Sequence, residues 1–140
     1  MKTNQRPLIG VTLGDVAGIG PEVLVKALQR TETLQACRIL VIGDARVFTD
    51  PKFSALCSPA QTITRIPENT DVLDGITLYD MHNLDTERIQ IGQVSALAGK
   101  AAVIYVIKAA ELALQGRIHA IATAPLNKEA IQIAGYHYIG

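Results

Sequence analysis

The stretch Leu8-Ile9-Gly10-Val11-Thr12-Leu13-Gly14-Asp15-Val16-Ala17-Gly18-Ile19-Gly20-Pro21-Glu22 decides the fold of this chain. Its apolar start predicts a buried strand over residues 8–13. The glycines that follow indicate a turn, and Pro21 suits the first turn of a helix, which we expect over residues 21–30. Such a junction presents free backbone N–H groups, and Asp15 adds a carboxylate. It is therefore typical of the mouth of an α/β ligand cleft.

Strands and helices alternate along the rest of the chain. Apolar runs predict further core strands over residues 38–42 and 119–123. Helices are expected over residues 45–56, with a break near Asp50-Pro51, over residues 95–115, and after residue 129 up to Gly135. Strands alternating with helices favour an α/β fold of three layers, α/β/α, with a mainly parallel sheet.

Residues 58–93 have a different composition and hydrophobic pattern from the rest of the chain. Short alternating pieces over residues 62–66 and 76–79 lie among Pro, Asn, Asp and Gly. They predict minor strands or an excursion from the main sheet, which would make residues 58–93 a sub-domain segment.

Two strand-to-helix turns carry the candidate site residues, residues 14–22 and 123–129. In a parallel sheet both turns fall at the carboxyl edge, where ligands bind. The first turn lacks the Gly-Lys-Ser/Thr ending of a P-loop, and its glycines at 14, 18 and 20 differ from the Rossmann spacing. Turn geometry alone is an alternative reason for these glycines.

The polar residues of the two turns can also be interpreted in two ways. Asp15 can orient a substrate hydroxyl, a ribose or a water, or it can cap its own loop. Lys128 lies in the first turn of its helix, where a positive charge opposes the helix dipole, so that either a bound phosphate or solvent exposure would explain it. Thr123 and Asn127 offer neutral hydrogen-bonding groups on the same turn.

Composition excludes several classes of protein. Thirteen basic and thirteen acidic side chains balance, and aromatic residues make up only 4%, which argues against a nucleic-acid partner. The apolar runs are too short or too interrupted by lysine for a signal segment or a membrane span. Cys37 and Cys57 lack metal or CxxC spacing, which predicts reduced thiols in a cytoplasmic protein. The three scattered histidines predict no metal site.

Three ordered blocks form a more specific pattern. They are Thr12, Gly14, Asp15, Ala17, Gly18, Ile19, Gly20, Pro21 and Glu22; then Gly92, Ser95, Gly99, Ala102, Tyr105 and Leu112; then residues 123–130 with Ala134 and Gly135. With these blocks the chain resembles the 4-hydroxythreonine-4-phosphate dehydrogenase family over nearly its whole length. Leu13 and Val16 stand where that family usually has prolines.

The resemblance implies a fold and a chemistry. The first block is also similar to the corresponding turn of isocitrate and isopropylmalate dehydrogenases, which implies their fold in incomplete form. The implied reaction is NAD(P)-dependent oxidation of a phosphorylated hydroxy acid, here 4-phosphohydroxy-L-threonine in pyridoxal phosphate biosynthesis, followed by decarboxylation. It also implies a divalent metal (Zn, Mg or Co) as Lewis acid and a homodimer.

In that family the catalytic residues and metal ligands follow the position of Gly140. The resemblance therefore implies that residues 1–140 are the N-terminal portion of a two-domain dehydrogenase, inactive alone, with the C-terminal part absent. The residues expected close to substrate or cofactor are Gly14, Asp15, Gly18, Gly20, Thr123, Asn127 and Lys128. Two alternatives remain: a D-threonate or D-erythronate 4-phosphate dehydrogenase, and a non-catalytic ligand-binding or assembly module.

Overall fold

The computed structural model describes residues 6–138 and contains one parallel sheet of five strands. The strands are β1 (Leu8–Thr12), β2 (Arg38–Gly43), β3 (Gln61–Ile63), β4 (Ile76–Asp80) and β5 (Ala120–Thr123). The helices are α1 (Gly20–Leu28), α2 (Thr31–Ala36), α3 (Ala96–Leu114) and α4 (Lys128–Ile133). Every paired strand is parallel, in the order β3-β4-β2-β1-β5. The predicted α/β class is confirmed.

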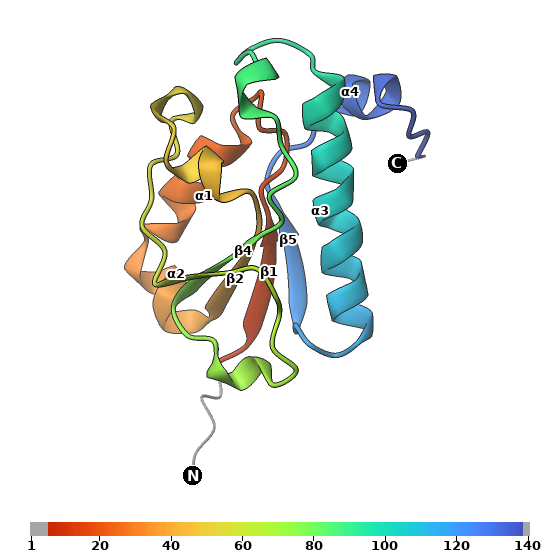
Figure 1. Ribbon diagram of the computed structural model, residues 1–140. Helices are drawn as coiled ribbons and strands as arrows, with labels where there is room; N and C mark the ends of the chain where they lie inside the picture. The colour runs from red at the N-terminus through yellow and green to blue at the C-terminus, as the bar shows by residue number, and fades with distance from the viewer. Residues whose placement is uncertain (1–5, 139–140) are drawn as a thin grey trace.

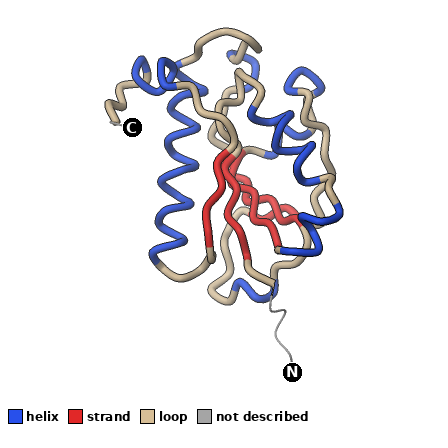
Figure 2. The backbone as a smooth tube through the Cα atoms, turned by 180° about the vertical axis from the view of Figure 1, so that it is seen from behind, coloured by secondary structure: helices blue, strands red, loops and turns tan. Residues whose placement is uncertain are grey.

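The helices cover the sheet in layers. Figure 1 shows α1 and α2 on one side of the strands and the long helix α3 on the other, and Figure 2 shows the same arrangement from behind. Helix α4 packs against α3 rather than against the sheet. None of the described helices is both long and apolar enough to cross a membrane.

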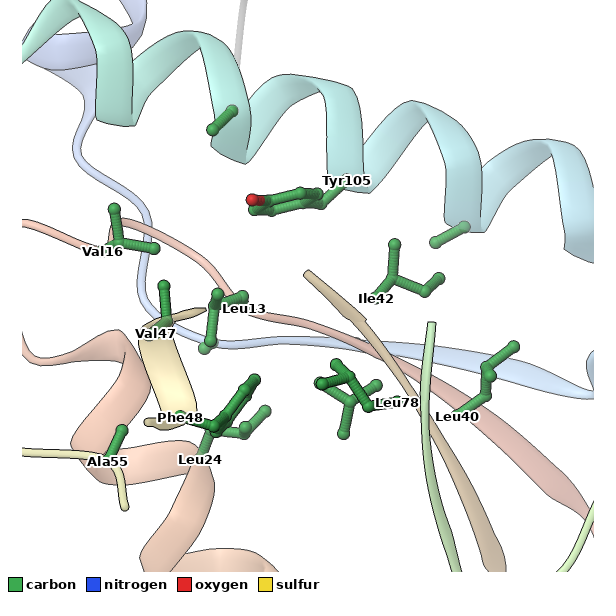
Figure 3. Packing of buried hydrophobic residues seen from close by; sticks show 14 of the residues in the cluster. Leu13, Val16, Leu24, Leu40, Ile42, Val47, Phe48, Ala55, Leu78 and Tyr105 are labelled. Atoms are coloured by element: carbon green, nitrogen blue, oxygen red, sulfur yellow. The ribbon is translucent and has the colours of Figure 1, made fainter. Parts of the chain in front are cut away.

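The core lies on both faces of the central strands. On one face, Tyr105 from α3 and Ile42 of β2 lie between the helix and the sheet; on the other, Leu24 of α1 lies close to Phe48 (Figure 3). The Tyr105 hydroxyl is satisfied by the Asn83 side chain at 2.9 Å, which allows a tyrosine to be wholly buried. This packing fixes β1, and with it the loop that follows.

The helix boundaries differ from the sequence predictions in two places. The first helix ends at Leu28, and a separate helix α2 follows, which the sequence did not suggest. The α-helix expected over residues 45–56 is wrong, although the break predicted near Asp50-Pro51 is present: the chain forms two 3-10 turns, Ala45–Phe48 and Pro51–Phe53. Asp44 and Asp50 each accept a hydrogen bond from the backbone N–H two residues on, which favours such short turns over a continuous helix.

One strand prediction is confirmed in part, and another needs correction. Of the two alternatives for residues 58–93, the structure shows the minor strands: β3 and β4 extend the main sheet beyond β2 in parallel register, and the segment makes no excursion from that sheet. Two further 3-10 turns, Thr70–Val72 and Thr86–Arg88, complete this segment. The strand expected at residues 119–123 exists as β5, but the expectation of a core strand is wrong. It lies at the sheet edge, and all four of its residues are exposed.

Candidate functional site

The strand order brings the two candidate turns together. β1 and β5 are neighbours in the sheet, with Thr12 beside Thr123 in the register. The chain leaves β1 toward α1 on one side of the sheet, and leaves β5 toward α4, which packs on α3 on the other side (Figure 1). Neighbouring parallel strands whose following loops diverge in this way open a crevice at their carboxyl ends, where α/β proteins bind ligands.

Backbone hydrogen bonds join the two loops directly. The Asp15 N–H donates to the Pro125 carbonyl at 2.9 Å, and the Ala124 N–H donates to the Thr12 carbonyl at 3.1 Å. From the other side, the Gly92 N–H donates to the Ala17 carbonyl at 2.7 Å. Two segments far from the first loop in the sequence, residues 124–125 and Gly92, therefore hold that loop in one conformation.

Close packing explains two of the three candidate glycines. Gly14 has a φ of +72°, and a Cβ there would lie 2.6 Å from the Pro125 carbonyl oxygen. A Cβ at Gly20 would lie 2.8 Å from the Leu13 carbonyl oxygen. Both positions require glycine because the backbone approaches so closely. This supports turn geometry, one of the two alternatives left open by the sequence, at these two positions.

An open hollow of about 550 Å³ lies between the loops. Its lining residues are Asp15, Gly18, Ile19, Pro125, Leu126, Asn127, Lys128 and Glu129. The structure thus brings together four of the seven predicted residues, Asp15, Gly18, Asn127 and Lys128. Gly14, Gly20 and Thr123 are not among the lining residues. Sequence reasoning missed four residues of this surface, although all lie in the two candidate turns: Ile19, Pro125, Leu126 and Glu129.

The Asp15 carboxylate is the most unusual group of the hollow. Its side chain is only 6% exposed. Burial raises the pKa of Asp15 above its ordinary value, and hydrogen bonds from the Ala17 N–H and the Asn127 side chain oppose that shift. The Asn127 oxygen in turn accepts from the Ala130 N–H at 3.0 Å, so this amide orders both loops.

A comparison of buried charges sets Asp15 apart. Three charged side chains are buried within residues 6–138: Asp15, Arg38 and Asp44. Asp44 pairs with Arg46 at 2.8 Å, and Arg38 lies 3.8 Å from Asp71. Asp15 alone among these three has no ion-pair partner in that part of the chain. Since buried charges are usually paired, an unpaired carboxylate at the wall of a hollow marks a candidate ligand-binding group.

The charges at the rim are mixed. Lys128 is exposed and makes no ion pair with any residue of the described chain. Glu129, next to it, is also exposed. Helix α1 begins nearby at Gly20, and its N-cap residue Ile19 provides no side-chain cap for the first N–H groups. A cation and free N–H groups favour an anionic ligand, while Glu129 opposes one.

One grouping elsewhere has the composition of a metal site. Ligand atoms of Asp44, Asp80 and His82 lie within 4.8 Å of one another. However, the Asp44 carboxylate already accepts three hydrogen bonds from Arg46 and one from the Leu84 N–H. These four donors occupy the lone pairs that a metal would need. The grouping does not fit a metal ion, and the metal ligands implied by the resemblance fall outside the described residues.

The residues that depart from the family pattern lie in the core. Leu13 and Val16 are both fully buried. A Cβ at Gly43 would lie 2.9 Å from the Leu13 side chain, which shows how closely Leu13 packs on β2. Neither residue lines the hollow. Any effect of these two substitutions on a ligand is therefore indirect, through the position of the loop.

Comparison with known proteins gives a consistent result. A curated relative from Clostridium botulinum, named "Putative D-threonate 4-phosphate dehydrogenase", is 39% identical over 98% of this chain and 41% of its own length. The solved 4-hydroxythreonine-4-phosphate dehydrogenase of Burkholderia phymatum matches with a TM-score of 0.79 and 39% identity, over 98% of this chain and 42% of that protein. The enzyme of that name from Klebsiella pneumoniae matches with a TM-score of 0.80 and 34% identity, over 99% of this chain and 42% of that enzyme.

This chain therefore spans about two fifths of the length of the relatives that it matches. The family model described as "Pyridoxal phosphate biosynthetic protein PdxA" matches residues 35–140. The family model covers the second candidate turn, residues 123–129. The alignments with the relatives cover both turns. The chain belongs to the PdxA family of pyridoxal phosphate biosynthetic proteins.

Proposed function

We propose that the hollow between the two loops is one wall of the substrate cleft of an NAD(P)-dependent dehydrogenase that oxidises a phosphorylated hydroxy acid. A single observation carries this proposal: the loops after β1 and β5 meet across a hollow lined by a buried, unpaired Asp15 and an exposed Lys128. The names of the relatives, which are dehydrogenases of phosphorylated substrates, supply the reaction class.

The charges suggest how such a ligand would lie. Its phosphate is placed against Lys128 and the uncapped start of α1, where positive potential is available. A hydroxyl group of the ligand is placed against Asp15, because a carboxylate without a cation can accept its hydrogen bond. Glu129 limits the affinity for the phosphate through like-charge repulsion, an effect that salt would screen.

Two substrates are candidates. The solved relatives carry the name of 4-hydroxythreonine-4-phosphate, and we propose 4-phosphohydroxy-L-threonine first. The name of the curated relative favours D-threonate 4-phosphate, with D-erythronate 4-phosphate as its close analogue. The buried Leu13 and Val16 do not decide between them, because neither contacts the hollow.

The remaining requirements of the reaction belong to the whole enzyme. We propose NAD(P) as the hydride acceptor, a divalent metal that stabilises the oxygen formed on oxidation, and a cytoplasmic homodimer in which this chain is the N-terminal part. We assign no described residue to the dinucleotide or to the metal. The 140-residue chain alone is accordingly expected to form no NADH.

Calorimetric titration of the whole enzyme, in which this chain is the proposed N-terminal part, tests the proposal. D-Threonate 4-phosphate and 4-phosphohydroxy-L-threonine should bind, and Lys128→Ala should weaken both by roughly tenfold, the value of one charge-assisted contact. Lys100→Ala is the matched control, since Lys100 is an exposed lysine of α3 that does not line the hollow, and its affinities should equal those of the wild type. Absence of binding, or equal losses in the two variants, would refute the assignment of the hollow.

A further inference from the structure

Gly18 differs from the other glycines of its loop. Its φ lies outside the left-handed region, unlike that of Gly14. A Cβ at Gly18 would find its nearest neighbour, the Oδ2 atom of Asp15, at 3.5 Å, which is ordinary van der Waals contact. The backbone at Gly20, in contrast, would clash with any Cβ. The fold therefore requires glycine at positions 14 and 20, but it would accept alanine at position 18.

The space that Gly18 leaves free lies beside the unpaired carboxylate. Both Gly18 and Asp15 line the hollow. The Oδ1 atom of Asp15 accepts from the Ala17 N–H at 3.1 Å, and the Asn127 amide supplies a second hydrogen bond to the carboxylate. An ionised carboxylate has about four lone-pair positions, so it can accept further donors. A methyl group at position 18 would occupy the approach to Oδ2 that such a donor needs.

We propose that Gly18 is a specificity-determining residue: the missing side chain lets a hydroxyl group of the phosphorylated ligand donate a hydrogen bond to Oδ2 of Asp15. This inference rests on the proposed function, because it assumes that the hollow binds a phosphorylated hydroxy acid. The inference extends the proposed function by assigning recognition of the phosphate and recognition of the hydroxyl group to different residues. Lys128 acts on the phosphate of any ligand, whereas Gly18 and Asp15 act only on a ligand that carries a hydroxyl.

The prediction can be tested with two matched ligands on the whole enzyme. D-Threonate 4-phosphate carries hydroxyls on its second and third carbons, and 4-phosphonooxybutanoate lacks both while keeping the phosphate and the carboxylate. The wild type should bind the hydroxylated ligand roughly tenfold more tightly, as expected for one hydrogen bond to a charged group. Gly18→Ala should abolish this ratio by weakening only the hydroxylated ligand. Its thermal midpoint should be no lower than that of the wild type.

Two further variants separate this inference from the proposed function. Asp15→Asn should reduce the ratio of affinities as Gly18→Ala does, while Lys128→Ala should weaken both ligands and preserve the ratio. An unchanged ratio in Gly18→Ala, or equal weakening of both ligands, would overturn the role of Gly18 while leaving the phosphate site intact. Absence of binding of either ligand to a folded wild type would overturn the proposed function and this inference together.

Discussion

Replacing Gly14 by alanine should strongly destabilise the fold. The alanine would have to adopt a φ near +72°, which costs a non-glycine residue about 1 kcal/mol. Its Cβ would also lie 2.6 Å from the Pro125 carbonyl oxygen, an overlap that costs about 1–3 kcal/mol to relieve. Moving the loops apart would break the hydrogen bond from the Asp15 N–H to Pro125, worth about 1 kcal/mol.

The expected loss in the free energy of unfolding is therefore about 3–5 kcal/mol. A small domain has only about 5–15 kcal/mol in total, so Gly14→Ala should be close to the limit of folding. Urea unfolding followed by far-ultraviolet circular dichroism measures the difference through the midpoint and slope of the transition.

Gly18→Ala is the control, four residues away in the same loop. Its Cβ makes only ordinary contacts, so its stability should lie within about 0.5 kcal/mol of the wild type or rise by up to about 1 kcal/mol. If Gly14→Ala unfolds like the wild type, the close approach of the two loops is refuted. If both variants lose the same stability, the distinction between the two glycines fails.

Three further predictions concern the surroundings of the site. Gly99→Ala should lower the free energy of unfolding by about 2 kcal/mol or more, because its Cβ would overlap the Ala130 carbonyl and push α4 off α3; urea unfolding measures this. Asp44→Asn should cost about 1–3 kcal/mol at pH 7 through lost contacts with Arg46. Burial opposes the shift, but hydrogen bonding to Arg46 lowers the pKa of Asp44. The stability difference between the wild type and Asp44→Asn should therefore shrink as the pH falls below 3.8. Thermal melts over a pH series that show a constant difference between the two proteins would contradict this. Asp15→Asn should raise the free energy of unfolding at pH 7. Burial raises the pKa of Asp15, which means that the ionised carboxylate is less stable in the folded than in the unfolded chain. The gain should vanish below pH 3.8, where the carboxyl group is protonated in both states.

Local patterns predicted the loops but not their partners. The apolar run before Gly14, the helix over residues 95–115 and the turn over residues 123–129 were all readable from sequence. The structure adds the side-chain caps at Ser95 and Asn127 that begin α3 and α4. The strand order was not readable, because any parallel order is compatible with the same runs. That order makes β1 and β5 neighbours and so brings Asp15 and Lys128 to one hollow.

Burial was the least predictable property. The residues of β5 have the apolar character of a core strand, yet all are exposed because no described element pairs beyond the edge. Similarly, the short turns after Asp44 replaced a helix because side-chain hydrogen bonds to the backbone competed with it. In both cases a long-range or side-chain interaction outweighed the local pattern.

Two features of the first loop are expected to lower the stability of the fold. Alanine at position 18 is expected to match or exceed the stability that glycine gives. The carboxylate of Asp15 is buried without a cationic partner, whereas that of Asp44 is paired with Arg46. Both departures occur side by side at the hollow, and nowhere else in residues 6–138 does a buried charge lack an ion pair. Such a loss of stability at one site is what selection for binding produces, because a group satisfied by the fold cannot also bind a ligand. The stability gained by Asp15→Asn and the hydroxyl recognition lost with it should therefore be found in the same variant.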